Sequence, residues 1–454
     1  MKVHFIAIGG SAMHNLALAM HKKGLKVSGS DDEIVEPSRG RLEKVGILPQ
    51  EAGWFEEKIS EELDAVILGM HARVDNPELI KAQKLGLKIY SYPGYIYEQS
   101  KRKQRIVIGG SHGKTSITAM ILHALGNNEI DTDYLVGAQL KGYDTMVKIT
   151  AEAPFILLEG DEYLASPIER VPKFHLYHPH IAVLSGIAWD HINVFPTFEN
   201  YLDQFRIFIS LIEKDGVLFY FEGDDELRKM VEESDRTDLR FVPYAEHASE
   251  IRDGVTYLKT NEGEVALKIF GKHNLQNLMA AKLVCEEAGL KDEEFYRSIS
   301  EFEGAARRLE LIFKGNGTHI FKDFAHSPSK LKATTEAAKS QFPDKRLVAC
   351  MELHTFSSLN AEFLEEYKGS MSSADEAIVY YNPHTVEHKK LAEITKDQVK
   401  KAFDNVSLQV YNNSEEVIQK LKSLDLNNSV LLMMSSGNFD GLKYEELPEL
   451  LKLN

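Results

Sequence analysis

The stretch Ile106-Val107-Ile108-Gly109-Gly110-Ser111-His112-Gly113-Lys114-Thr115-Ser116 decides the fold of this 454-residue chain. An apolar run enters a glycine-rich turn, and a helical pattern over 117–125 follows at once, so the stretch predicts a strand, a loop and a helix. The glycines let backbone N–H groups face a polyphosphate, Lys114 can reach its terminal oxygens, and Thr115 can bind Mg²⁺. Ile108 departs from the usual pattern, which has glycine there, but the strand–loop–helix context still predicts a site for ATP or GTP.

The composition is that of a soluble enzyme, and we expect the protein to be cytoplasmic. Acidic residues outnumber basic ones by 69 to 53, and the net charge of −16 argues against nucleic acid or an anionic membrane as the main partner. No apolar stretch comes near the roughly 20 residues that span a bilayer. The first residues read as a strand and not as a signal peptide. Cys285 and Cys350 lack metal-ligand spacing, so we expect both to fill the core.

Strand-like apolar runs alternate with helical patterns along the chain, which is typical of α/β domains with parallel sheets. We expect three such domains, at 1–103, 104–307 and 308–454, with the basic stretch Lys101-Arg102-Lys103 as a linker. The acidic, turn-rich stretch 222–264 is expected to be a peripheral insertion. Further strands are expected to end at Ile8 and to cover 89–90, 155–158, 181–184, 347–350, 377–380 and 430–434.

Polar residues follow two of the central strands. Glu159 comes directly after four apolar residues, with Asp161 and Glu162 just beyond it, and Asp190-His191 follows the run 181–184. Ligands of open α/β sheets bind outside the carboxyl ends of the strands, so Glu159 stands where a nucleotide-bound Mg²⁺ needs an oxygen ligand. The plainer alternatives are a solvated acidic turn and a structural histidine.

The turn after the first strand, Gly9-Gly10-Ser11-Ala12-Met13, partly matches a dinucleotide-binding fingerprint, but Ala7 and Ala12 stand where its outer glycines belong. The second strand delivers Ser30-Asp31. A carboxylate at this distance from the turn can bond a ribose hydroxyl, which suits either a dinucleotide or a UDP-linked ligand.

Three later clusters crowd polar residues between apolar runs. Asn274 or Asn277 could bond an adenine edge, Arg308 could neutralise phosphate, and Asp323 could hold a ribose. From the residues alone, each cluster is equally consistent with a helix cap, a surface ion pair or a turn.

Taken together and in this order, the motifs resemble those of the Mur ligase family of bacterial cell-wall synthesis, over essentially the whole chain. The family's phosphate loop is similar to 110–116 and its acidic strand end to Glu159. Its Asp-His pair is similar to Asp190-His191, its H-N-x-x-N string to 273–277, and its D-[DY]-x-H-x-P string to 323–328.

The resemblance implies an α/β fold with a Rossmann-like UDP-sugar domain, a central P-loop ATPase domain with a mostly parallel sheet, and a Rossmann-like domain for the incoming amine. It also implies ATP and two Mg²⁺ ions as cofactors, and UDP-N-acetylmuramate with a peptide or amino acid as substrates. By position it assigns the UDP sugar to Gly9, Gly10, Ser11, Ala12, Met13, Ser30, Asp31 and His71, and ATP to Gly110, Ser111, His112, Gly113, Lys114, Thr115, Ser116, His273, Asn274, Asn277, Arg308 and Asp323. The metal ligands are Thr115, Glu159 and His191, the amine-substrate residues are His354, Ser436 and Asn438, and the catalytic residues are Lys114, Glu159, His191 and His326.

Local strings favour one member of the family. The stretches Gly69–Pro77, Glu159–Tyr163 and Met434–Phe439 resemble the member that joins a recycled tripeptide, L-Ala-γ-D-Glu-meso-diaminopimelate, to UDP-N-acetylmuramate. One departure is His71, which stands where that member usually has alanine.

The alternative is the member that adds free L-alanine. The stretch 354–358 is similar to its P-H-x-[YF]-x-R string, but Leu353 replaces the proline, and Ser358 replaces an arginine expected to help hold the amine substrate. Ser327 stands where a second histidine is common, and Arg206 stands where some members carry a carbamylated lysine, so we expect no carbamate.

The chemistry implied is phosphorylation of the lactyl carboxylate by ATP, followed by attack of an amine on the acyl phosphate. Lys114 and one Mg²⁺ would serve the nucleotide, His191 would hold a second Mg²⁺, and His326 would lie near the amine. Segments near 103 and 308 are expected to act as hinges that close the site to water. A regulatory protein that has lost ligation and a nicotinamide-dependent oxidoreductase are further alternatives. The acidic and histidine motifs disfavour the first, and Ala7 and Ala12 disfavour the second.

Overall fold

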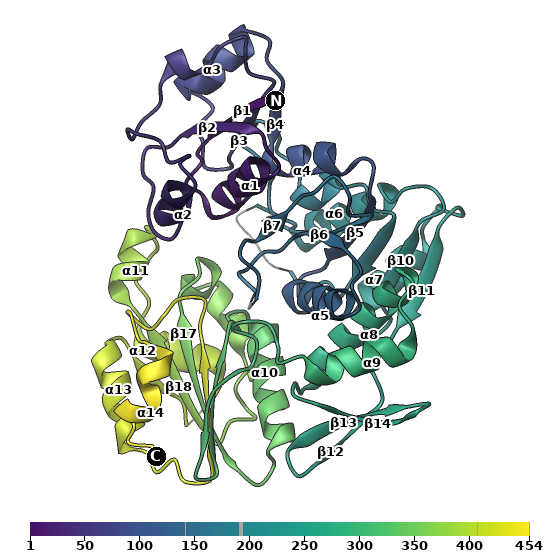
Figure 1. The fold of residues 1–454 in the computed structure, drawn as a ribbon. Helices are drawn as coiled ribbons and strands as arrows, with labels where there is room; N and C mark the ends of the chain where they lie inside the picture. The colour runs from purple at the N-terminus through teal and green to yellow at the C-terminus, as the bar shows by residue number, and fades with distance from the viewer. Residues whose placement is uncertain (141, 190–193, 406, 454) are drawn as a thin grey trace. The chain divides into compact units, whose positions relative to one another are not determined.

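The computed structural model describes residues 1–140, 142–189, 194–405 and 407–453. Its contacts divide the chain into two compact units, Met1–Ala245 with Ala280–Glu294, and Glu246–Met279 with Phe295–Asn454. Figure 1 traces the chain through both units. Helices α8 (Lys272–Glu287) and α9 (Asp292–Glu301) each contribute residues to both units.

The first unit opens with a parallel four-stranded sheet in the order β2-β1-β3-β4. Strand β1 was expected to reach Ile8, but it ends at Ile6, because Ala7 adopts a positive φ of 67° that turns the chain. The strands are β1 (Lys2–Ile6), β2 (Lys26–Ser30), β3 (Ala65–Leu68) and β4 (Ile89–Ser91), and the helices are α1 (Ser11–Lys22), α2 (Ser38–Lys44), α3 (Pro77–Lys84) and α4 (Tyr92–Ser100).

A seven-stranded sheet follows in the order β11-β10-β9-β5-β8-β6-β7, parallel except for β7. Strand β5 carries the phosphate loop at its end and lies in the middle of the sheet between β8 and β9, so the loop sits at the centre of the carboxyl edge. The elements are β5 (Gln104–Gly109), α5 (Lys114–Asn127), β6 (Thr132–Leu135), β7 (Val147–Lys148), β8 (Phe155–Glu159), β9 (Ile181–Leu184), α6 (Phe198–Ser210), β10 (Val217–Phe221), α7 (Asp225–Glu232) and β11 (Arg240–Tyr244).

The expectation of a peripheral insertion over 222–264 is wrong for its first half, because β11 is a strand of the seven-stranded sheet. Helix α7 buries Leu227 and Met230 beside β10 and turns its acidic residues outward, so the acidic composition belongs to one exposed face of a regular helix. The second half forms an antiparallel sheet in the second unit, made of β12 (Ser249–Arg252), β13 (Val255–Thr260) and β14 (Gly263–Leu267).

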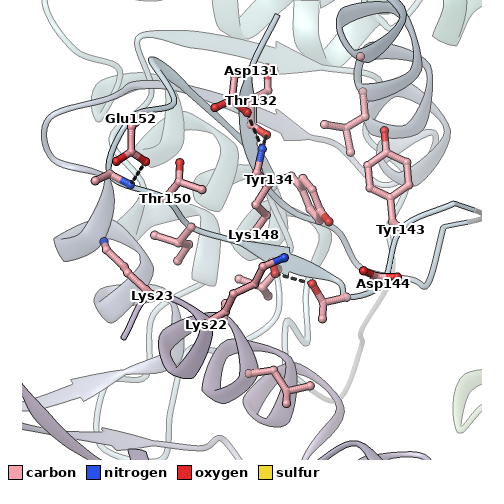
Figure 2. A pocket seen from close by; sticks show the side chains of 18 of the residues that line it. Lys22, Lys23, Asp131, Thr132, Tyr134, Tyr143, Asp144, Lys148, Thr150 and Glu152 are labelled. Carbon is pink, nitrogen blue, oxygen red and sulfur yellow. Dashed lines mark hydrogen bonds and ion pairs between the residues drawn. The ribbon is translucent and has the colours of Figure 1, made fainter. Parts of the chain in front are cut away.

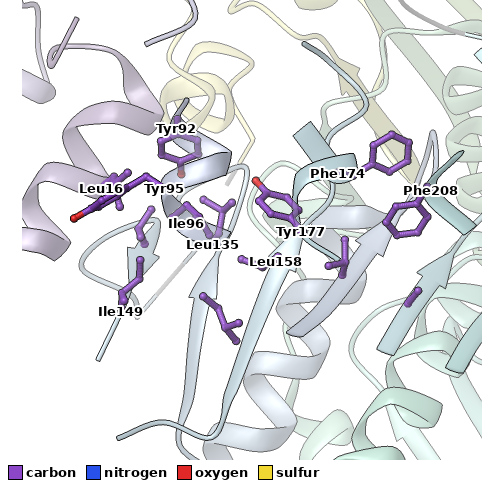
Figure 3. Close-up of a cluster of buried hydrophobic side chains, with 14 of the residues drawn as sticks. Leu16, Tyr92, Tyr95, Ile96, Leu135, Ile149, Leu158, Phe174, Tyr177 and Phe208 are labelled. Atoms are coloured by element: carbon purple, nitrogen blue, oxygen red, sulfur yellow. The ribbon is translucent and has the colours of Figure 1, made fainter. Parts of the chain in front are cut away.

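One continuous hydrophobic core joins both sheets of the first unit. Leu16 and Tyr95 from the first sheet's helices belong to the same buried cluster as Ile149 and Phe174 from the segments around the second sheet (Figure 3). In the candidate linker Lys101 and Arg102 are exposed, whereas Lys103 is buried and forms an ion pair with Asp133 at 2.9 Å, with its side chain 6% exposed. The expected hinge near residue 103 stays a prediction.

The second unit contains a six-stranded sheet in the order β15-β16-β20-β17-β18-β19, parallel except for the pair β15 and β16. Its strands are β15 (Glu310–Gly315), β16 (Thr318–Asp323), β17 (Arg346–Leu353), β18 (Glu376–Tyr381), β19 (Gln409–Tyr411) and β20 (Ser429–Met434). Its helices are α10 (Pro328–Gln341), α11 (Pro383–His388), α12 (Lys396–Phe403), α13 (Ser414–Ser423) and α14 (Leu447–Leu450).

Both cysteines fill the core, as the sequence predicts. Cys285 and Cys350 are each 0% exposed, and burial raises the pKa of both thiols. No helix among the described residues combines the length and the apolar character needed to cross a membrane.

Candidate active site

The phosphate loop has the conformation that its glycines predict. Gly110 has a φ of 116°, and a Cβ there would lie 2.4 Å from Ser185 Oγ and 2.9 Å from the backbone nitrogen of Ser185, so only glycine fits. Gly113, with a φ of 77°, caps the N-terminus of α5. Ile108 is a fully buried strand residue paired with Glu159, which explains why glycine is not required at that position.

The ammonium of Lys114 is surrounded by oxygen atoms, including a carboxylate. Its ammonium donates to Gly110 O at 2.6 Å and forms an ion pair with Glu162 at 2.7 Å. Burial opposes the charge, but the nearby carboxylates of Glu162 and Asp161 outweigh it, so the pKa of Lys114 is raised. The lysine is therefore a cation held ready beside the loop.

The two predicted metal ligands that the structure describes lie together. Thr115 Oγ1 donates to Glu159 Oε1 at 2.7 Å, and the other oxygen of Glu159 accepts from Gly137 N at 2.7 Å. A Cβ at Gly137 would lie 2.8 Å from Glu159 Oε1, so the backbone leaves room for this carboxylate only because residue 137 is glycine. A hydroxyl and a carboxylate are hard oxygen ligands, and they fit Mg²⁺.

His191, the third predicted ligand, lies outside the described residues. Within the described parts of the chain, no group of three or more His, Cys, Asp or Glu residues has the arrangement of a metal site. Arg206, which stands where some family members carry a carbamylated lysine, forms ion pairs with Glu199 and Asp203 on α6.

The sequence interpretation noted Asp161 and Glu162 after the strand, but it missed Lys173 and Tyr201, which contact these two carboxylates. Asp161 forms an ion pair with Lys173 at 2.5 Å. Burial raises the pKa of Asp161, but Lys173 and Lys114 outweigh it and lower the pKa to about 2. Tyr201, from α6, is fully buried and hydrogen-bonds both Glu162 and Ser111. A tyrosine on the apolar face of a helix carries no signal of its own, because the same pattern describes an ordinary core position.

The predicted UDP-sugar turn is built around Asp31. Gly9 N donates to Asp31 Oδ2 at 2.6 Å, and a Cβ at Gly9 would lie 2.9 Å from that oxygen. Burial, followed by the neighbouring Asp32, raises the pKa of Asp31 to about 6. Ser30 O accepts from Ala7 N and Ile8 N at 2.9 and 3.1 Å, so the turn and the end of β2 are held together.

The other residues predicted for this site differ in exposure. Ser11 and Ala12 lie exposed at the start of α1, Met13 is buried in the core, and His71 is exposed in the loop after β3. The structure thus brings Gly9, Ser30 and Asp31 together.

The remaining predicted nucleotide residues belong to the second unit. Asn274 and Asn277 are each 5% exposed, and Asn274 Nδ2 donates to Phe270 O at 2.8 Å. His273 lines a cavity of about 840 Å³ between α8, α10 and the antiparallel sheet. Burial and then Arg308 lower its pKa to about 4.

Asp323 organises its surroundings through the backbone. Its two oxygens accept from Leu309 N and Ala325 N, both at 2.7 Å, and burial raises its pKa. Arg308 stacks over the Phe324 ring at 4.9 Å. His326 Nδ1 lies 2.7 Å from Phe324 O. The cluster joins Arg308, Asp323 and His326 on one side of the second unit, and their roles in ligand binding stay predictions.

One residue predicted for the amine substrate, His354, lies beside a buried carboxylate that the sequence interpretation missed. Glu352, 2% exposed, lies 3.6 Å from His354 Nδ1 and accepts from Phe439 N at 2.9 Å. It also accepts a hydrogen bond from Ser435, next to Ser436. Asn438 instead caps a turn, since its Oδ1 accepts from Gly441 N at 3.0 Å. The signal that could have found Glu352 is an acid within an otherwise apolar strand.

A separate cavity of about 750 Å³ lies in the first unit near the C-terminal ends of α1 and α5 (Figure 2). Lys22, Lys148, Tyr134 and Tyr143 are among its lining residues, and Lys148 forms an ion pair with Asp131 at 2.5 Å. None of the residues predicted for substrates lines it. Helices α1 and α5 begin at the two predicted ligand turns, so this cavity lies at their opposite ends.

Comparisons with known proteins identify the family of the chain. The chain matches models of the Mur ligase family, catalytic domain over residues 2–104, the Mur ligase middle domain over 108–285, and the Mur ligase, glutamate ligase domain over 307–437. A UDP-N-acetylmuramate–L-alanine ligase from Desulforamulus reducens is 30% identical over 392 residues, which cover 82% of this chain and 81% of that protein.

Two solved structures have the same fold. A murein peptide ligase from Psychrobacter arcticus has a TM-score of 0.65 at 22% identity and covers 100% of this chain and 99% of its own. A UDP-N-acetylmuramate-alanine ligase from Thermotoga maritima has a TM-score of 0.69 at 20% identity, with coverage of 100% and 98%. The chain belongs to the Mur ligase family and is an ATP-dependent carbon–nitrogen ligase.

Proposed function

We propose that this protein joins a peptide of the L-Ala-γ-D-Glu-meso-diaminopimelate type to the lactyl carboxylate of UDP-N-acetylmuramate, at the expense of ATP. The site that supports the nucleotide step is the phosphate loop with Lys114, together with the Thr115–Glu159 pair. Mg²⁺ on Thr115 and Glu159 would neutralise phosphate charge when bound. A second Mg²⁺ is assigned to His191 by resemblance alone.

Two bond exchanges account for the reaction. A carboxylate oxygen attacks the γ-phosphorus of ATP, and the bond to the ADP oxygen breaks. The peptide amine then attacks the acyl carbon, the bond to phosphate breaks, and the amine loses a proton. The first step brings two anions together, so its barrier depends on the cation of Lys114 beside the loop. His326 is proposed to lie near the amine.

The observation that carries the choice of a peptide is Ser358. It replaces the arginine expected in the L-alanine member, and it is 0% exposed, with its N–H donating to Thr355 Oγ1 at 3.1 Å inside the turn. A buried, neutral serine cannot pair with the carboxylate of free alanine. A longer acceptor can bind through residues farther from its amine, and half-exposed His354 beside Glu352 is one candidate.

The second candidate is L-alanine ligation, which the name of the 30% identical Desulforamulus reducens relative favours. ADP release from the purified protein with ATP, Mg²⁺ and UDP-N-acetylmuramate distinguishes the two. We expect a higher kcat/KM with the tripeptide than with L-alanine. A preference for L-alanine would overturn the peptide assignment, and release with neither acceptor would overturn the proposed substrates.

A further inference from the structure

A chain of hydrogen bonds inside the first unit links the two ends of the phosphate loop. Ser111 Oγ lies 2.8 Å from Tyr201 OH, Tyr201 OH donates to Glu162 Oε1 at 3.2 Å, and Lys114 forms an ion pair with the other oxygen of Glu162 at 2.7 Å. Ser111 Oγ also accepts from Ala188 N at 2.9 Å, just beyond β9. The Tyr201 hydroxyl from α6 therefore joins the loop to the segment after β8, and Ser111 extends the chain to the segment after β9.

The direction of each bond follows from the available protons. Tyr201 has one hydroxyl proton and donates it to Glu162, so the Ser111 hydroxyl must donate to the Tyr201 oxygen. Ser111 in turn accepts from the backbone. Serine, tyrosine and carboxylate thus form one polarised chain that ends on the ammonium of Lys114.

The surroundings hold Tyr201 in place. Its side chain is fully buried, and its ring packs against Phe195 and Phe205 with centroids 5.4 and 5.2 Å away. Glu162 is equally enclosed, with its side chain 3% exposed. Water cannot reach these buried groups. If the Tyr201 hydroxyl is removed or displaced, Glu162 and Ser111 each lose a hydrogen bond that no water replaces.

We propose that Tyr201 is a positioning residue for nucleotide binding: through Ser111 and Glu162 its hydroxyl fixes the curvature of the phosphate loop and the place of the Lys114 ammonium. The proposal deepens the proposed function and rests on it only in that ATP is the nucleotide. When phosphate takes the ammonium, Glu162 keeps the Tyr201 hydrogen bond, so the buried carboxylate is not left without a donor.

The test is Tyr201→Phe, which removes only the hydroxyl. We expect the Kd for a fluorescent ATP analogue with Mg²⁺, and the KM for ATP, to rise about tenfold, since hydrogen bonds to charged groups are the stronger ones. The KM for the amine acceptor should stay the same. A Kd within twofold of the unmodified protein would overturn the proposal.

The matched control is Tyr95→Phe. Tyr95 is also fully buried in the first unit, and its hydroxyl has no hydrogen-bond partner among the described residues. We expect its nucleotide Kd to be unchanged. An equal loss in both variants would show that any buried tyrosine has this effect, and would contradict a specific role for Tyr201.

A double-mutant cycle separates positioning from general packing. Glu162→Gln can still accept from Tyr201 but no longer pairs with Lys114, so adding Tyr201→Phe to it should cost less than Tyr201→Phe does alone. Strictly additive effects would overturn the route through Glu162. If Tyr201→Phe melts below the assay temperature, the Kd of both proteins is measured at a lower temperature at which both are folded, with the same expectation. If the protein binds nucleotide but ligates neither the tripeptide nor L-alanine, the result counts against the proposed function and not against this network.

Discussion

Lys114 is buried and keeps its positive charge, although burial removes the water that would stabilise that charge. Its pKa is raised because Glu162 and Asp161 more than offset the cost of burial. A carboxylate that attacks a phosphate needs such a cation, since charge develops where both partners are already negative.

Removal of this cation gives the first prediction. Lys114→Ala should lower kcat for ADP release by about 100-fold or more, because one preorganised charge contact to a transition state has that order of effect. Circular dichroism should show an intact fold. Near-normal amide formation by this variant would contradict the nucleotide site.

Asp31 gives a prediction on pH. Its pKa is raised to about 6 from the ordinary value of 3.8, so the folded state binds the proton more tightly than the unfolded chain does. The stabilising contribution is therefore complete below about pH 4 and is lost as the pH rises through about 6. Asp31→Asn keeps an oxygen for Gly9 N but does not titrate.

The measurement is the melting temperature of both proteins between pH 4 and pH 8. We expect the unmodified protein to lose stability relative to Asp31→Asn as the pH rises through this range. A difference that is independent of pH would show that Asp31 titrates at its ordinary value.

At the scale of elements, the phosphate loop depends on the close approach of β9. Gly110→Ala would place a Cβ 2.4 Å from Ser185 Oγ at a φ of 116°. We expect it to abolish nucleotide binding and to lower the free energy of unfolding by about 1–3 kcal/mol. Gly126→Ala, near the C-terminal end of α5, is the matched control because a Cβ there meets nothing within 4 Å. Isothermal titration with ATP and urea unfolding report both effects, and equal results for the two variants would contradict this account.

The same elements show how far the sequence predicts this molecule. The strand, loop and helix around Lys114 and the placement of Glu159 are local patterns, and the structure confirms them. Tyr201 could not be predicted, since its contact with Ser111 spans 90 residues of the chain. For Glu352 the sequence offers only an acid in an apolar strand, and its partner Ser435 lies 83 residues away. The prediction of a peripheral insertion over 222–264 was wrong for its first half because the strands there are short and the helix buries only a narrow face, so acidic residues dominate the composition.

For the whole molecule, the predicted nucleotide residues fall in both compact units. Lys114 and Glu159 belong to the first unit, and Asn277, Arg308 and Asp323 to the second. A ligand that binds native residues raises the stability of the unit that holds them. We therefore expect a non-hydrolysable ATP analogue with Mg²⁺ to raise the unfolding temperature of both units in calorimetry.

Two variants show which residues cause the shift in unfolding temperature of each unit. Lys114→Ala should reduce the shift of the first unit, and Asp323→Asn the shift of the second. If the second unit's transition does not move at all with nucleotide, Asn277 and Asp323 have no part in nucleotide binding.

The buried cysteines have a practical consequence for experiments that measure ligand-driven rearrangement with fluorescent dyes. Cys285 and Cys350 are fully enclosed, and their raised pKa values leave almost no thiolate to react. Maleimide dyes should therefore not react with the two native thiols. They should label only cysteines introduced at exposed positions, one in each unit. Single-molecule energy transfer between two such dyes could then report ligand-driven rearrangement without first removing the native thiols.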